Sequence, residues 1–179
     1  MNTERAGTLA KQSGFAVVGP LDVGALSFRQ DVRDMCTPEL CPEGYGQSWS
    51  CPPAVPALEE LSVRARAFTE GILVQTIGEL EDPFDFETVM ETSALHAEHF
   101  MELTDRLGAE TERPLLALGA GACKRCASCT YPDAPCALPD KQIVSMEASG
   151  LLVNQVCEDS GISYNNGENT ITFTSCCLF

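Results

Sequence analysis

Short apolar runs and longer amphipathic stretches alternate along the chain. Runs at residues 15–18, 71–77 and 114–118 consist mainly of aliphatic residues bordered by glycine or proline, which is typical of short buried strands. Residues 21–35 have a mixed pattern that predicts no particular element. The pattern therefore indicates strands at three separate places, with room for helices between them.

Two segments show the spacing of amphipathic helices. A helix that begins near Pro56 would present one apolar face, made of Leu58, Leu61, Ala65 and Phe68. Residues 86–107 repeat this spacing over a longer stretch, and Gly108 supplies a stop. His96 and His99 lie three residues apart within it, where we expect a solvated polar face and no metal site.

The last third of the chain predicts one more helix and a hairpin. Residues 151–158 read as a short helix, and the turn sequence Asn165-Asn166-Gly167 favours a hairpin between residues 162–164 and 169–179. The length suits a single domain over residues 1–179. We expect an α/β or α+β fold, with a small mixed sheet, flanking helices and cysteine-rich loops at the sheet edge.

Charge and hydropathy limit the classes of partner that the protein can bind. The formal net charge is −15, from 26 acidic and 11 basic residues, so binding to nucleic acid is disfavoured. Such a surface suits docking to a basic patch on a redox enzyme, although it also serves solubility. No apolar run suits a membrane span or a signal sequence, so we expect a soluble, cytoplasmic protein with no membrane partner. In that reducing compartment, ten cysteines indicate metal binding more than disulfides.

The main cysteine motif lies within residues 123–139. Its members follow one another at short intervals: Cys123, Cys126, Cys129 and Cys136. Three thiolates spaced by two residues fit three corners of a [4Fe–4S] cluster, and a later cysteine closes the fourth. Zinc is the alternative, although its usual site joins two separated cysteine pairs. A third interpretation is that these cysteines form disulfides.

A second group, Cys36, Cys41 and Cys51, lies in the proline- and glycine-rich segment 36–53, which predicts an irregular loop. We expect a second metal site there, partly shielded by Tyr45 and Trp49. Alternatively, these cysteines are small buried hydrophobes.

Three thiolates would leave the fourth iron of a second cluster without a protein ligand. Cys157, Cys176 or Cys177 could supply one, but their positions on a helix and a strand predict core packing. We therefore expect an open cluster site. Glu147 is the carboxylate to consider beside the main cysteine loop, as a proton donor or a partner of a bound metal; alternatively it caps the next helix.

Three ordered motifs carry a family resemblance: the segment from Cys41 to Pro53, Gly119-Ala-Gly-Ala-Cys123-Lys-Arg-Cys126, and Ser145-Met-Glu147-Ala-Ser-Gly150. With these motifs the chain resembles the predicted metal-binding proteins of domain of unknown function 2284, over most of its length. The resemblance implies a cytoplasmic metal-binding protein, with iron–sulfur as the expected cofactor, of a kind found mainly in anaerobes. It implies no established reaction.

Three functions are consistent with these residues. The first is a redox protein with one or two [4Fe–4S] clusters that passes electrons to a larger enzyme. The second is an enzyme whose open cluster acts as a Lewis acid on a small molecule. The third is a zinc-stapled interaction module. No nucleotide-binding glycine loop, Ser-His-Asp arrangement or flavin fingerprint points to a substrate.

Overall fold

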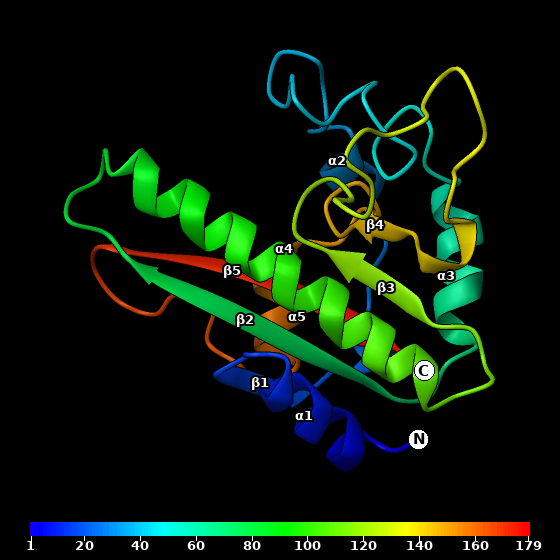
Figure 1. Cartoon of the computed structure of the whole chain (residues 1–179), viewed down its shortest axis with the longest axis horizontal. Coiled ribbons are helices and arrows are strands. Elements are labelled where there is room, and N and C mark those ends of the chain that lie inside the picture. Colours follow the sequence, from blue (N-terminus) through cyan, green and yellow to red (C-terminus); the bar gives the residue numbers. More distant parts are fainter.

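The computed structural model describes the whole chain, residues 1–179, as an α+β fold built on one five-stranded sheet (Figure 1). The strands are β1 (Val17–Pro20), β2 (Gly71–Glu79), β3 (Leu116–Gly119), β4 (Ile143–Ser145) and β5 (Thr170–Leu178). The α-helices are α1 (Thr3–Gln12), α2 (Gln30–Arg33), α3 (Leu58–Arg66), α4 (Phe86–Ala109) and α5 (Val153–Asp159). Two short 3-10 helices, η1 (Val23–Ala25) and η2 (Pro139–Lys141), complete the elements.

The sheet is mixed, as the sequence predicts. Its strand order is β1-β2-β5-β3-β4, and only the β3–β4 pair is parallel. The longest ladder joins β2 to β5 in register from Gly71 opposite Leu178 to Glu79 opposite Thr170. These two strands have nine residues each and form the longest pair in the sheet.

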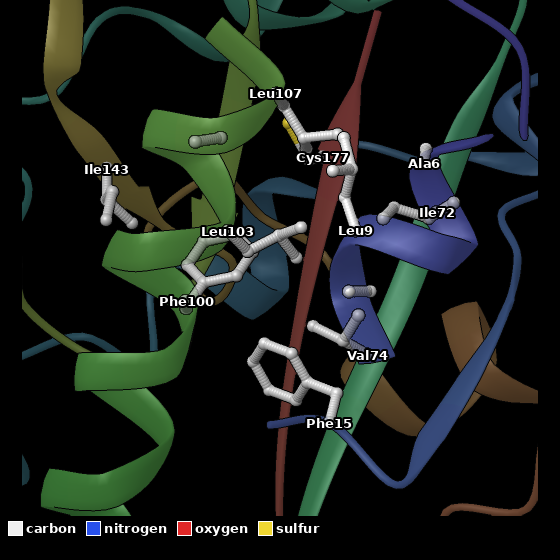
Figure 2. Close-up of a cluster of buried hydrophobic side chains, with 12 residues drawn as sticks. Ala6, Leu9, Phe15, Ile72, Val74, Phe100, Leu103, Leu107, Ile143 and Cys177 are labelled. Carbon is white, nitrogen blue, oxygen red and sulfur yellow. The ribbon is translucent and has the colours of Figure 1, made fainter. Parts of the chain in front are cut away.

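Alternate residues of the strands supply two separate cores, one on each face of the sheet. On one face, Ile72 and Val74 meet α1 and α4, which contribute Leu9, Phe100, Leu103 and Leu107. Figure 2 shows these side chains packed between α4 and α1 across β5 and β2. On the other face, Leu73 packs with residues of α3, α5 and the segment between β4 and α5. Burial on both faces explains why the central strands read as continuous apolar runs.

The predicted strands and helices in the middle of the chain are confirmed. The run at 71–77 lies in β2, the run at 114–118 overlaps β3, which begins two residues later than predicted, and the amphipathic segments form α3 and α4. Helix α4 continues through Gly108 to Ala109, one residue past the expected stop. None of the helices combines the length and apolar character needed to cross a membrane.

The predicted C-terminal hairpin is wrong. Residues 162–164 form no strand, and β5 pairs with β2 and β3 instead. Ile162 is held at the end of α5, where its N–H donates to Cys157 O at 2.9 Å. Pairing with β2 over nine residues thus outweighs the local preference of the Asn-Asn-Gly sequence for a hairpin turn.

The N-terminal helix α1 was not predicted. Asn2 accepts a hydrogen bond from the N–H of Arg5 at 2.9 Å, and Glu4 lies in the first turn. These are the ordinary signals of a helix start. The buried side of α1 carries Ala6, Leu9 and Ala10, and two of these residues are too small to give a clear apolar stripe.

His96 is buried, which contradicts the expected solvated face. Its side of α4 meets the sheet, and the residue is 2% exposed. Its Nδ1 lies 2.9 Å from Thr76 Oγ1 on β2, and its Nε2 lies 2.7 Å from Ser175 Oγ on β5. Burial lowers the pKa of His96 from 6.5 to about 4, so the ring is neutral at physiological pH.

Candidate functional site

Both cysteine groups lie in long segments without helix or strand, one between α2 and α3 and the other between β3 and η2. Figure 1 shows these two segments together at one side of the sheet, near β4 and α2. The predicted loop 36–53 falls within the first segment, and the predicted loop 123–139 extends one residue past the second, to Pro139 at the start of η2. The sheet and its helices thus hold two irregular, cysteine-bearing segments beside each other.

The first group lines one cavity. Cys36, Cys41 and Cys51 share a cavity of about 570 Å³. Most of its other lining is apolar and comes from the end of α2, the segment after it and the start of α5, including Met35, Leu40, Leu151 and Val153. Cys51 is buried, whereas Cys41 is exposed. The group therefore sits at the wall of a space with the volume of a small-molecule site.

Gly44 shows how closely two of these thiols approach the backbone. A Cβ at position 44 would lie 2.8 Å from Cys41 Sγ and 3.5 Å from Cys51 Sγ. The first distance is too short for a real contact, so only glycine leaves the Cys41 sulfur in place. The turn between the two cysteines thus forms a cradle in which both sulfurs lie on the side of Gly44 where a side chain would project.

Two thiols of the first group, Cys36 and Cys51, lie where burial favours the protonated form. Burial is the largest cause that raises the pKa of Cys36, and the Glu147 carboxylate raises it further. Burial also raises the pKa of Cys51, against the opposing hydrogen bonds of Ser48 and Ser50. Because a metal takes the thiolate form, binding at this group would release protons.

Glu147 belongs to the first group and not to the main cysteine loop where the sequence suggested it. It lines the same cavity as Cys36. Ser145 Oγ donates to Glu147 Oε2 at 2.8 Å and accepts from the N–H of Ala148 at 3.2 Å. The capping alternative is wrong, because α5 begins at Val153 and no side chain caps it.

The turn that carries Glu147 is pinned from α2. Arg33 Nε donates to Ala148 O at 2.6 Å, and its Nη2 donates to Pro56 O at 2.7 Å. One guanidinium thus ties the Glu147 turn to the end of the first cysteine segment. The position of the carboxylate beside the thiols is therefore set by α2 as well as by Ser145.

The second group also lines one cavity. Cys123, Cys126, Cys129 and Cys136 share a small space with Trp49, and all four cysteines are partly exposed. Trp49 was expected to shield the first group, but it lies against the second. Its Nε1 donates to Ala134 O at 3.0 Å, and its ring meets Tyr131 edge-on at a centroid distance of 5.0 Å. Tyr45 remains with the first group, as expected.

Ser50 joins the two groups, a role that no pattern in the sequence indicates. Its hydroxyl accepts a hydrogen bond from the N–H of Cys123 at 2.8 Å and lies 2.9 Å from Ser48 Oγ. Its carbonyl accepts from the N–H of Ser145 at 3.2 Å. Because Ser50 precedes Cys51, one residue contacts the backbone of both cysteine segments and of the turn that carries Glu147.

The three remaining cysteines pack in the core, as predicted. Cys157, Cys176 and Cys177 are fully buried, and none of them lines either cysteine cavity. Successive residues of a strand point to opposite faces, so Cys176 and Cys177 belong to different cores. Burial raises the pKa of Cys177 to about 12, which makes this thiol unreactive.

The donor set fits a thiolate-bound metal. Seven cysteines in two groups provide the ligands that iron–sulfur clusters and zinc both take. No cluster of three or more His, Cys, Asp or Glu side chains in this structure is arranged to hold a single metal ion.

Comparison with known proteins gives one family and no close relatives. The model of the family described as predicted metal-binding protein matches residues 19–179. No curated protein and no solved structure matches the chain. The match covers both cysteine groups, the Glu147 turn and every strand except the first two residues of β1. The chain therefore belongs to the family of predicted metal-binding proteins called domain of unknown function 2284.

Proposed function

We propose that this metal-binding protein is an iron–sulfur redox protein. In this proposal Cys123, Cys126, Cys129 and Cys136 hold one [4Fe–4S] cluster, and the first group holds a second. The observation that carries it is the shared cavity of the four closely spaced cysteines. A cubane takes one thiolate at each of its four irons, which suits a run of thiolates better than a single tetrahedral ion does.

The adjacency of the two groups supports electron transfer between them. Ser50 accepts a hydrogen bond from Cys123 and directly precedes Cys51, so this one residue would connect a ligand of each cluster. The acidic surface, with a net charge of −15, suits a basic docking patch on a larger redox enzyme. We therefore propose that the protein acts as a small electron carrier, in which electrons pass from one cluster to the other.

The metal content tests this proposal directly. Protein produced and kept without oxygen should contain roughly eight irons and eight sulfides per chain, or roughly four of each when only the second group is loaded. Cys126→Ser should remove about four irons, whereas Cys157→Ser should leave the content unchanged because Cys157 is a core residue. One or two zinc ions per chain and no iron would instead establish the zinc-binding alternative.

A second function is favoured by the cavity at the first group. Three cysteines leave one corner of a cubane without a protein ligand, and this group faces a space of about 570 Å³. An iron with an open position acts as a Lewis acid on a bound small molecule. Glu147, held by Ser145 at 2.8 Å, lies where it could exchange a proton with such a molecule.

An exogenous ligand distinguishes the open site from a closed one. Cyanide should change the electron paramagnetic resonance signal of the reduced protein, and this change should be lost in Cys51→Ser. Cys176→Ser should respond like the unaltered protein, because Cys176 lies in the core. A cyanide response that Cys51→Ser retains would place the open iron elsewhere. No response in a protein that contains eight irons would show that both clusters are closed.

A further inference from the structure

A basic cavity interrupts the acidic surface, next to the cavity of the second cysteine group. It has a volume of about 600 Å³ and lies between α3, the C-terminal end of α4, the segment that enters β3, and η2. Its cationic lining residues are Arg64, Arg113, Arg125 and Lys141. The chain has only 11 basic residues, so more than a third of them border this one space.

From this cavity we infer a binding site for a small molecule that carries a phosphate or a carboxylate group. The site goes beyond the proposed redox function and does not depend on which metal the cysteines hold. Guanidinium groups bind both kinds of oxyanion through paired N–H donors. The volume lies in the range of ligand cavities, whereas a docking surface for a protein would be broad and open.

Carboxylates within the cavity neutralise only part of this charge. Asp105 accepts from Arg125 Nη1 at 2.9 Å and lies 3.1 Å from Lys141 Nζ, so one carboxylate engages two cations. Asp140 adds a second negative charge, and the last turn of α4 adds partial negative charge from its carbonyl groups. Arg64 and Arg113 form no ion pair with any residue of the chain. Both are exposed and free to contact an anion.

Arg125 gives an independent indication of a missing partner. Its side chain is only 8% exposed. Its Nη2 donates to Thr104 Oγ1, and its Nη1 donates to Asp105, but its Nε–H has no acceptor in the protein. Buried donors are normally paired, and an unpaired one next to a cavity points to a ligand atom there. An oxyanion oxygen would satisfy this donor.

The overall negative charge of the protein does not prevent anion binding here. At physiological ionic strength charges are screened beyond about 8 Å, so a bound anion experiences mainly the groups that line the cavity. These comprise four cations and two carboxylates. The local field therefore favours a singly or doubly charged anion.

The cavity also lies beside the second cysteine group. Arg125 stands between Cys123 and Cys126, and both Arg125 and Gln142 line the basic cavity as well as the cysteine cavity. A bound anion would consequently contact the loop that carries these cysteines. This position suits a substrate or an effector of the metal centre.

Titration calorimetry on the full, metal-loaded chain tests the inference, with inorganic phosphate and succinate as separate probes in low salt. We expect saturable binding of at least one probe at millimolar concentration or below. Phosphate alone would identify the ligand as a phosphate compound, and succinate alone as a carboxylate. In Arg64→Gln/Arg113→Gln the affinity should fall about tenfold or more, because two charge-assisted contacts are lost. Both residues are exposed, so the variant should fold normally.

Arg66→Gln is the matched control. Arg66 lies on α3 close to Arg64 and is exposed, but it does not line the cavity. This variant should bind like the unaltered chain. Equal weakening by Arg66→Gln and by the double variant would overturn the inference, since it would indicate a general charge effect. The inference would also be overturned if neither phosphate nor succinate bound at concentrations up to about 10 mM. Binding of a glutamate-rich peptide alone would overturn it as well, since the cavity would then bind an acidic protein.

Discussion

At the scale of single residues, the first cysteine group depends on a position that has no side chain. Gly44 is buried, and it leaves the space that the sulfurs of Cys41 and Cys51 occupy. Its φ is not in the left-handed region, so its backbone would accept alanine. The requirement for glycine at this position is therefore a matter of space next to the thiols.

Gly44→Ala should disable the first group and leave the second intact. The new Cβ would meet Cys41 Sγ at 2.8 Å and force that sulfur to move. Under the two-cluster proposal, iron content should fall from roughly eight to roughly four per chain, while the melting temperature of the metal-free protein stays within a few degrees.

Gly7→Ala provides the comparison for this substitution. Position 7 lies in α1, and a Cβ there would meet only Val18 Cγ1, at 3.9 Å. This variant should keep its full metal content and gain up to about 1 kcal/mol of stability from helix propensity. If both alanine variants kept all their iron, the cradle at Gly44 would not be needed for metal binding.

The same scale shows what the sequence could predict about the site. The spacing of the cysteines was enough to separate two groups, and the structure gives each group its own cavity. It was not enough to place Trp49 or Glu147, because each lies beside the cysteine group that is more distant along the chain. Local spacing reports on neighbours in sequence, whereas these two contacts depend on how the segments cross.

At the scale of secondary-structure elements, α4 is tied to the centre of the sheet by a polar chain. His96 bonds to Thr76 of β2 and to Ser175 of β5, and the Ser175 hydroxyl also accepts from the N–H of Ala120 at 3.0 Å. Ala120 begins the segment that leads to Cys123. The network therefore links the helix, two strands and the entrance of the second cysteine loop.

This network should make stability sensitive to acid. The pKa of His96 is lowered from 6.5 to about 4 in the folded protein, so the unfolded chain takes up a proton at higher pH than the folded chain does. The contribution is complete above pH 6.5 and is lost as the pH falls toward 4, by about 3 kcal/mol in total. Urea denaturation at a series of pH values measures this loss.

His96→Gln isolates the contribution of the ring. The free energy of unfolding of this variant should fall less steeply than that of the unaltered chain between pH 6.5 and 4, and the two curves should run parallel above pH 7. Subtracting the curves cancels the carboxylates that both proteins share. Curves that stay parallel throughout this range would show that His96 titrates normally in the folded state.

Elements with a long apolar run or a long amphipathic pattern could be predicted from the sequence. Strand β2 and helix α4 are of this kind. The predicted hairpin did not form because the local turn signal competes with a distant partner. The ladder between β2 and β5 joins residues that lie about a hundred positions apart along the chain. Helix α1 escaped notice because alanine contributes two of its three buried positions.

At the scale of the whole molecule, the distribution of charge matters more than its total. The net charge of the chain is −15, yet four of its 11 basic residues gather around one cavity. They come from positions 64, 113, 125 and 141, which no sequence window brings together. The fold is thus required to reveal a basic site in an acidic chain, whereas the cysteine motifs were visible without it.

The two cysteine segments supply no fully buried residue to the apolar cores that hold the sheet and helices together, and only Cys123 and Val55 pack against these cores. Nearly all residues of both cores come from helices, strands and the turn after β4, and Cys51 is in neither of them. In small zinc modules the chain folds only when the metal binds, because the hydrophobic core alone is too small to stabilise the fold. Here the sheet has its own hydrophobic support on both faces, so folding can precede metal delivery. The folded protein would then bind metal through thiols that are already in place. The metal could also be removed and replaced without unfolding the sheet and its helices.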